Sequence, residues 1–580
     1  MTKNKSPFPV ILISLVLLLV FAPVFATIDD VFVASILDGR ISGTPSADTV
    51  YMGLVLSGIL SGLYSLLPFV PWFGVFQSIA IIGVFALLSK RIFCRQRSRG
   101  SILFWALTSC FIFLSYGLRN LLLPTYTITA GILVGGGLLP ILFPREEKKW
   151  KDYILIGFFL FLSYETRAQV FLMSTPFLVL AILYRLMTTP RKECKPTKSL
   201  GIFILVFALL MGGMAWLDHC QAILTPERNE YKKFNELRTE VLDYYAIYAE
   251  GEVVGYYNSM GIPTEEVKMD ASQLWLLKDD LNTKSLEVYA SYGRAMRNYS
   301  TLSAMKWAVP RYLREAKEGI YLYYNIFILL LLVTYLVQGI RYRKMVPFWR
   351  GLVTFLLLVV GRSIIILYLM GTGRYPERVV TPLYFWEALL ALKLVVDVFP
   401  VAEEKSLRKD LPAWILLGCS CVFAGMFAGL RALPEYRMQA EVNKPFEDVM
   451  KKMQEHPDTL YLLDTYAFCH ATEKAFHLTN HQEKPENILF LGGWLPGSPL
   501  LTEKMENLTE GVSAAEKLLA GDAVFVTRKD TQLGPTQPIV EAYLDITLDQ
   551  VDTYAYQVPE AVLGRLNADS IEFEMYRIKK

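Results

Sequence analysis

The feature that most constrains this chain is a series of apolar runs, many of them about twenty residues long, which is the length that crosses a bilayer as a helix. The composition agrees, because 53% of the 580 residues are hydrophobic and the mean hydropathy is +0.34. A soluble protein of this length could not bury that much apolar surface. The sequence therefore predicts an α-helical, multi-pass membrane protein.

The candidate spans are separated by connections rich in Lys and Arg, and such connections stay on the cytoplasmic side. They all fall on that side if 51–67 does not cross and instead lies along the outer surface as an interfacial helix. We therefore expect eleven spans, a cytoplasmic N-terminus and an extracytoplasmic C-terminus. The candidate segments are 8–26, 51–67, 73–88, 101–118, 121–143, 154–164, 168–187, 199–219, 318–338, 349–371, 379–398 and 411–430.

Three hydrophilic parts then lie outside: a first external loop over 27–72, a helical insert over 220–317 and the C-terminal part from 431–580. The last part alternates short apolar strands with helices, which predicts a small α/β domain. Its expected strands are "TLYLLDT", "NILFLGG", "DAVFVTR" and "SIEFEMYRI". We divide the chain into a membrane domain, 1–430, which includes the first loop and the insert, and an extracytoplasmic domain, 431–580.

Two adjacent acids, Asp29 and Asp30, follow directly on the first apolar run. Ionised carboxylates at the edge of hydrocarbon are costly unless they have partners or a function. A carboxylate at the outer surface can deprotonate an acceptor hydroxyl as a general base, or hold a divalent metal ion against a phosphate. One acid can act while the other orients it. The alternative is that either acid N-caps the helix that starts at "VFVASILDG".

Arginines at the outer surface are the second candidate group, because basic residues otherwise favour the cytoplasmic side. Arg374 and Arg378 stand in the loop "GTGRYPERVVTP", and Arg119 follows "FLSYGL". A guanidinium binds phosphate in bidentate fashion, so a lipid phosphate is a suitable ligand. Contact with ordinary lipid headgroups is the alternative.

The segment 154–164 covers roughly 16 Å of a ~30 Å hydrocarbon core at ~1.5 Å per residue. The turn "YETRAQ" after it is therefore expected below the outer surface, inside protein. There Arg167 could hold an anionic headgroup, or it could form a structural ion pair with Glu165. The predicted cavity residues are Tyr164, Glu165, Asp218 and His219.

Two further charges interrupt consecutive spans that are joined by a short outer loop. Counted from the outer ends of their spans, Arg362 lies nine and Glu387 eight residues deep. Equal depth predicts a buried ion pair. Its expected role is structural, because removing one partner would leave an uncompensated buried charge.

Several features together resemble the GT-C superfamily of integral-membrane glycosyltransferases, which use polyprenyl-phosphate sugars. They are the first apolar helix with "IDD" at its outer end, the long external loop with the surface helix "GLYSLLPFVPWFG", the many spans and the soluble C-terminal domain. The chain is similar to bacterial members with unassigned substrates, over about 8–430. The resemblance implies that Asp29 or Asp30 is the catalytic base beside the donor phosphate. In some families the first-loop acids also bind a metal ion. A WWDYG-like motif is missing, so an oligosaccharyltransferase is not expected.

We therefore expect an inverting transfer of a sugar from a polyprenyl-phosphate donor to a cell-envelope polymer or glycolipid on the outer face of the membrane. The donor phosphate would be held by some of Arg119, Arg167, Arg374 and Arg378. The expected partners are the donor, the acceptor glycan and the bilayer, and a net charge of +3 does not indicate nucleic acid. No cofactor is certain, and a divalent metal ion stays open. The alternatives are a lipid-linked oligosaccharide transporter and an envelope polysaccharide polymerase.

Overall fold

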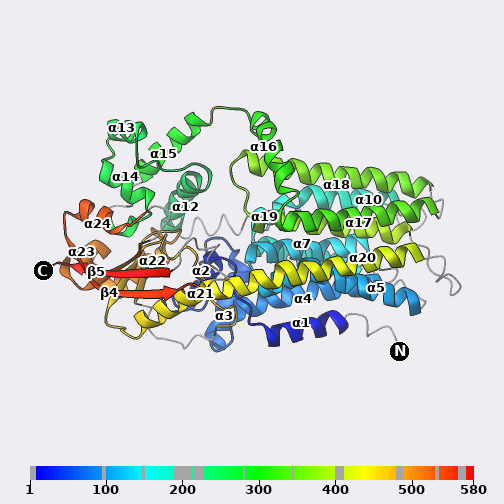
Figure 1. Ribbon diagram of the computed structural model, residues 1–580, viewed down its shortest axis with the longest axis horizontal. Helices are drawn as coiled ribbons and strands as arrows, with labels where there is room; N and C mark the ends of the chain where they lie inside the picture. The colour runs from blue at the N-terminus through cyan, green and yellow to red at the C-terminus, as the bar shows by residue number, and fades with distance from the viewer. Residues whose placement is uncertain are drawn as a thin grey trace.

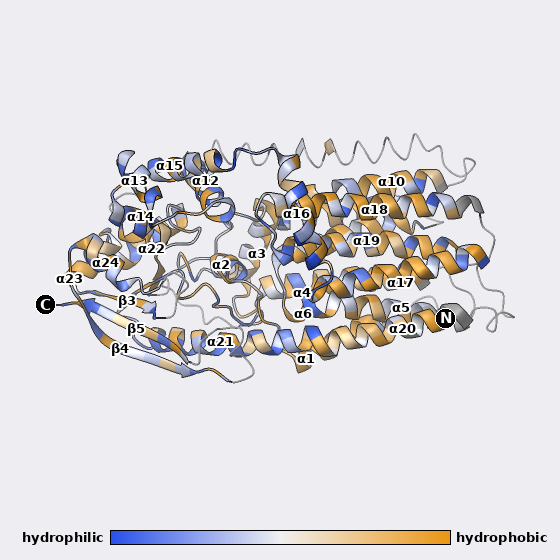
Figure 2. Ribbon diagram, turned by 45° about the horizontal axis from the view of Figure 1, so that its top comes forward, coloured by the Kyte–Doolittle hydropathy of each residue, from blue (hydrophilic) through white to orange (hydrophobic). Residues whose placement is uncertain are grey.

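The structure is a computed structural model, and it describes most of the chain. The described residues are 8–93, 99–145, 150–188, 226–278, 281, 283–341, 345–398, 411–477, 487–529, 534–559 and 570–579, together with single helical positions between 201 and 216. A bundle of long helices fills one end of the molecule, and a small sheet with shorter helices fills the other (Figure 1). The bundle helices are largely apolar, whereas the other end is mixed (Figure 2).

The bundle contains α1 (Phe8–Val20), α4 (Trp72–Phe93), α5 (Arg99–Ile112), η1 (Phe113–Gly117), α6 (Leu118–Leu122), α7 (Tyr126–Leu142), α8 (Trp150–Thr166), α9 (Ala168–Met173), α10 (Thr175–Thr188), α17 (Gly319–Arg341), α18 (Met345–Gly371), α19 (Glu377–Val398), α20 (Leu411–Phe427) and η4 (Ala428–Ala432). The elements η1 and η4 are π-helical. Every residue of α7 is buried. Its glycines allow this, because a Cβ on Gly135 would come within 2.3 Å of the ring of Phe385.

Five helices in the described part of the chain are long and apolar enough to cross a membrane: Trp72–Ile92, Gly319–Arg341, Phe348–Gly371, Glu377–Val398 and Trp414–Gln454. Shorter apolar helices cover Pro9–Val20, Leu54–Leu66, Tyr126–Leu142 and Thr175–Met187. These helices make the chain a multi-pass membrane protein. Eleven crossings and the orientation of the termini stay predictions, and 199–219 lies largely outside the described residues.

The expected length of the helix at 154–164 was wrong. The helix α8 has 17 residues and is about 25 Å long, although this is still shorter than a ~30 Å core. It begins earlier than expected because Asp152 in its first turn is buried in an ion pair with Arg91, at 2.6 Å. Because the ion pair offsets the cost of burying these charges, the helix can begin before residue 154.

The part of the molecule outside the helix bundle, which we call the external part, is built from three stretches of chain. The first loop forms α2 (Ile28–Leu37) and α3 (Leu54–Leu66), and α3 matches the segment expected to lie along the surface. The insert forms α12 (Pro226–Thr239), the π-helix η2 (Glu240–Tyr244), α13 (Glu252–Ser259), α14 (Thr264–Ala271), η3 (Trp275–Leu277), α15 (Thr283–Met296) and α16 (Thr301–Glu315). The C-terminal part begins with α21 (Leu433–Gln454), which continues the helix of α20 through η4.

The C-terminal part forms the predicted α/β arrangement. Its elements are β1 (Leu460–Leu463), β2 (Ile488–Phe490), α22 (Pro499–Thr509), α23 (Ala514–Ala520), β3 (Ala523–Arg528), α24 (Gln537–Leu544), β4 (Leu548–Gln557) and β5 (Ser570–Ile578). The sheet order is β2-β1-β3-β5-β4. β1 pairs in parallel with β2 and β3, and β5 pairs antiparallel with β3 and β4. All four expected strands form, and β4 is an addition.

The carboxyl ends of β1 and β2 face the first external loop. After β1, Glu473 bonds Arg40 at 2.7 Å and the Ala475 N–H donates to the Pro23 carbonyl at 2.7 Å. After β2, Trp494 packs its ring edge-on against Phe32 of α2, with ring centroids 5.6 Å apart. The external sheet is therefore docked on the segment that carries the acid pair.

Candidate active site

The two acids of the pair have different surroundings, although both lie in the first turn of α2. Asp30 is fully buried, whereas the side chain of Asp29 is 22% exposed. The N-cap of α2 is Thr27, so the alternative reading, in which either acid caps its own helix, was wrong. Adjacent residues on a helix point about 100° apart. Here Asp30 points into the protein, whereas Asp29 points toward Arg378 and Trp494.

Asp30 acts as a cap for a different helix. Its Oδ1 accepts the backbone N–H of Tyr126, the first residue of α7, at 2.7 Å. Thr27 donates to Oδ2 at 2.7 Å and Gln77 donates to Oδ1 at 3.3 Å. Burial raises the pKa of Asp30 to about 7, although the hydrogen bonds from Thr27 and Tyr126 oppose this. These bonds tie the first turn of α2 to α4 and to the start of α7.

Asp29 bonds across three parts of the chain. Its Oδ2 lies 2.9 Å from Nη2 of Arg378, in the first turn of α19. Its Oδ1 accepts the indole N–H of Trp494, from the loop after β2, at 3.3 Å. Each carboxylate oxygen therefore has one donor and keeps room for another, because a carboxylate oxygen can accept two.

Arg374 lies in the loop between α18 and α19 and connects that loop to the insert. Its Nη1 lies 2.8 Å from Oδ2 of Asp243 in η2, and the two side chains are 29% and 31% exposed. Its guanidinium also lies 5.6 Å from the ring centroid of Tyr244. Arg374 and Arg378 thus stand four residues apart, and each is paired with a half-exposed carboxylate.

Arg167 has aromatic partners. Its guanidinium lies 4.5 Å from the ring centroid of Tyr51 and 5.3 Å from that of Tyr126, and it donates to the Tyr126 hydroxyl at 2.9 Å. None of the ion pairs within the described part of the chain involves Arg167. It is half-buried, so it presents a positive charge that the described carboxylates do not neutralise.

These groups form one cluster, which we call the arginine cluster: Asp29, Tyr126, Arg167, Arg374 and Arg378. Tyr126 interacts electrostatically with Arg167, Asp29 and Arg378, and Arg378 interacts with Asp243 as well as Asp29. Three guanidiniums face the two half-exposed carboxylates, Asp29 and Asp243. Asp243 lies beside the cluster and is counted with it, so three guanidiniums and two carboxylates leave one positive charge when Asp30 is protonated.

Arg119 differs from the other predicted phosphate ligands. It is buried and forms a bidentate pair with Glu435, at 2.8 and 2.6 Å. Its Nη2 also lies 2.7 Å from Glu377. Two carboxylates already outweigh its charge, so its geometry does not favour a further anion, and we leave Arg119 out of the proposed site.

The predicted cavity residues have other contacts in this structure. Glu165 is buried and accepts the backbone N–H of Leu56 at 2.8 Å, so it caps α3. Tyr164 is half-buried and packs edge-on against Phe171, with centroids 5.7 Å apart. Asp218 and His219 lie outside the described residues. Glu165 therefore fixes the start of α3, and the wall of the site near Arg167 is formed by Tyr51 and Tyr126 instead.

Arg362 and Glu387 lie in contact at 2.7 Å, and both are buried. Arg362 also donates to Asn325 at 3.1 Å and lies 4.4 Å from the ring centroid of Tyr384. The pair joins α17, α18 and α19 inside the bundle.

Sequence reasoning missed three contributors: Tyr51, Asp243 and Trp494. Each lies in a different segment from the acids and arginines that it contacts. A signal existed for Trp494 alone, since residues at the carboxyl ends of parallel strands often form sites. Among the described residues, no three His, Cys, Asp or Glu side chains are grouped so that they could hold a metal ion.

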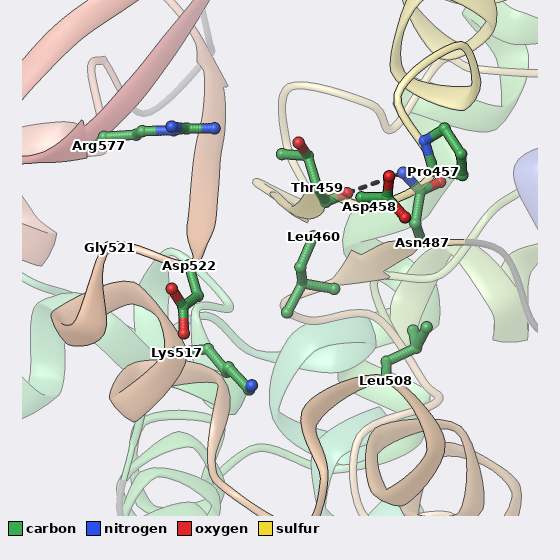
Figure 3. A pocket seen from close by; sticks show the side chains of 10 residues that line it. All are labelled: Pro457, Asp458, Thr459, Leu460, Asn487, Leu508, Lys517, Gly521, Asp522 and Arg577. Carbon is green, nitrogen blue, oxygen red and sulfur yellow. Dashed lines mark hydrogen bonds between the residues drawn. The ribbon is translucent and has the colours of Figure 1, made fainter.

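Two cavities lie away from the arginine cluster. One, of about 410 Å³, sits at the amino ends of β1, β2 and β3, and Asp458, Lys517 and Arg577 are among its lining residues (Figure 3). The other, of about 720 Å³, lies between α12 and α22. Its wall includes Tyr231, whose hydroxyl donates to the backbone carbonyl of Trp494.

The comparisons with known proteins add little to this geometry. No protein-family model matches the chain, and no curated protein matches it. Among solved structures, a crystal structure of ArnT from Cupriavidus metallidurans in the apo state matches with 12% identity, over 98% of this chain and 96% of that chain, at a TM-score of 0.38. A likeness of this size says nothing about the site, which stands on its own contacts.

Proposed function

We propose that this chain is an integral-membrane glycosyltransferase of the GT-C type. It would move a sugar from a polyprenyl-phosphate donor to a hydroxyl of a cell-envelope polymer or glycolipid, on the outer face of the membrane. One observation carries the proposal: the half-exposed carboxylate of Asp29 lies 2.9 Å from Arg378 at the end of the bundle, within a cluster of three arginines. A base beside a phosphate-binding group is what this reaction needs.

The charge of the cluster favours a singly charged donor. A sugar attached to a lipid monophosphate is a phosphodiester and carries one negative charge. The arginine cluster has one guanidinium, that of Arg167, without a carboxylate partner among the described residues. The donor phosphate would therefore settle between Arg167 and Arg378, where guanidinium groups can bind two of its oxygens.

The proposed step is a single displacement. Asp29 takes the proton of the acceptor hydroxyl, and the hydroxyl oxygen attacks the anomeric carbon of the sugar. The bond between that carbon and the phosphate oxygen breaks, and its electron pair leaves with the lipid phosphate. The arginines stabilise the charge that develops on the leaving phosphate. One displacement on a carbon inverts its configuration.

Donor binding would also release the base. Arg378 now pairs with Asp29, and a phosphate that takes over this guanidinium leaves the Asp29 carboxylate with the indole N–H of Trp494. A carboxylate with fewer cationic neighbours is a stronger base. A divalent metal ion, which the sequence leaves open, would first have to displace Arg378 from Asp29 or Arg374 from Asp243.

The test compares the two neighbouring acids. Membranes that contain wild type, Asp29→Asn or Asp30→Asn at equal protein levels are incubated with a panel of polyprenyl-phosphate sugars, and released polyprenyl phosphate is measured. We expect release to be lost in Asp29→Asn and retained in Asp30→Asn, which keeps the contacts of a buried cap. Full release by Asp29→Asn, or no release from any donor by the wild type, would overturn the proposal.

A further inference from the structure

The helix α16 carries an exposed apolar stripe. Leu302, Val309 and Leu313 are 62%, 38% and 53% exposed. They are seven and four residues apart, so they lie on one face of the helix. Large apolar side chains that are aligned and exposed mark a contact surface for a partner or a membrane.

The opposite face of α16 packs against α18, which is one of the candidate spans. A Cβ on Gly371, the last residue of α18, would lie 3.2 Å from the Cβ of Ala304. Further along, the hydroxyls of Tyr312 and Ser363 lie 2.8 Å apart. The two contacts are eight residues apart on each helix, and the residue numbers rise along α16 while they fall along α18. The two helices are therefore antiparallel here.

These contacts show how far α16 reaches along α18. Ser363 lies eight residues before the end of α18, which is about 12 Å along the helix. With 27 residues, α18 is about 40 Å long, which exceeds a ~30 Å hydrocarbon core by about 10 Å. The last residues of α18, beside the stretch of α16 between Ala304 and Tyr312, therefore reach the outer headgroup region. The same span exposes apolar residues that can face only lipid, such as Val360 and Ile364, each 52% exposed.

The polar residues of α16 agree with this position. Lys306, Arg311 and Arg314 are exposed, and Trp307 is 67% exposed. Cationic residues together with Trp beside an apolar stripe are typical of helices that lie in the headgroup region. Figure 2 shows α16 at the end of the bundle nearest the external helices.

We infer that α16 is an interfacial helix, embedded in the outer leaflet of the bilayer. Its stripe of Leu302, Val309 and Leu313 contacts lipid acyl chains, and Lys306 and Arg314 contact lipid phosphates, whereas Arg311 pairs with Glu315. The insert is then held on the membrane at its C-terminal end. This inference rests on the packing and exposure of α16 and on the predicted orientation of the spans, and it does not depend on the proposed transfer reaction.

The test is photocrosslinking in native membranes with p-benzoylphenylalanine placed at Leu302 or at Leu313, followed by intact-mass spectrometry. Two positions of similar exposure serve as matched controls. Leu357 on α18 is 50% exposed and should report lipid, whereas Met260 beside α13 is 47% exposed and should report water. Figure 1 places α13 at the far end from the bundle.

We expect phospholipid adducts at Leu302 and Leu313, as at Leu357, and none at Met260. Adducts at Leu357 with none at Leu302 and Leu313 would overturn the inference. Adducts with another protein at the two α16 positions would also overturn it, because the stripe would then be a protein interface. All four substituted side chains are exposed, so the variants should fold, and no step of the test requires enzymatic activity.

Discussion

The burial of Asp30 makes the stability of the protein depend on pH in a way that one substitution should remove. Asp30→Asn keeps the shape of the side chain and all three contacts. The amide oxygen can accept from the backbone N–H of Tyr126 and from Gln77, and the amide NH₂ can donate to the Thr27 hydroxyl. The substitution removes only the ionisation of a group that has no solvent around it.

The size of the effect follows from the raised pKa. Burial moves the pKa of Asp30 from 3.8 to about 7. Between these values the unfolded chain loses the proton while the folded protein keeps it, so the stability of the wild type falls as the pH rises. At about 1.4 kcal/mol per pKa unit, the loss reaches roughly 4 kcal/mol and is complete above pH 7. The variant does not suffer this loss.

The assay is thermal unfolding in detergent at several pH values between 4 and 8. The advantage of Asp30→Asn over wild type should be small near pH 4, grow with pH and level off above pH 7. Glu506→Gln, which changes an exposed carboxyl on α22, is the control and should show no such trend. If the advantage is the same at pH 5 and pH 8, or if the variant is less stable at pH 8, the reasoning about Asp30 is wrong.

Three further predictions test other contacts. Asp243→Asn removes the 2.8 Å ion pair with Arg374 and frees that guanidinium for phosphate, so KM for a lipid-phosphate donor should fall severalfold at unchanged kcat; a higher KM would contradict this. Glu387→Leu alone leaves the buried charge of Arg362 unpaired and should cost about 3–5 kcal/mol of stability. Adding Arg362→Met should recover most of that cost in thermal unfolding, and a double variant as unstable as the single one would show that they do not act as a pair. Gly53→Ala places a methyl group within 2.4 Å of the carboxylate that caps α3 and should lower the free energy of unfolding by about 1–3 kcal/mol; an unchanged melting temperature would argue against that cap.

The sequence was most informative where burial covers a whole element. Four strands of the external sheet could be predicted, because their residues are apolar and bounded by turns. The fifth, β4, was missed because it is an edge strand, and most of its side chains are exposed. An exposed strand has no apolar pattern to read, and it is held by its backbone pairing with β5.

Partners could be predicted only where geometry limits the choice. Arg362 and Glu387 lie at equal depth on spans joined by a short loop, and they are in contact. Arg119 looked free because its partner Glu435 is 316 residues away. The same holds for Asp29 and Trp494, which are 465 residues apart. A single sequence shows which charges need partners, but long-range packing decides which partners they obtain.

The helix from Trp414 to Gln454 runs without a break from the bundle to the external sheet. With 41 residues it is about 60 Å long. The π-helical turn η4 holds one extra residue. This residue sets the rotation of α21 about the helix axis relative to α20. Loss of that residue would turn everything beyond it by about 100°. The sheet would then swing away from the first loop, and the indole of Trp494 could no longer meet the carboxylate of Asp29. The placement of the external sheet on the first loop therefore depends on a single π-helical turn at the end of α20.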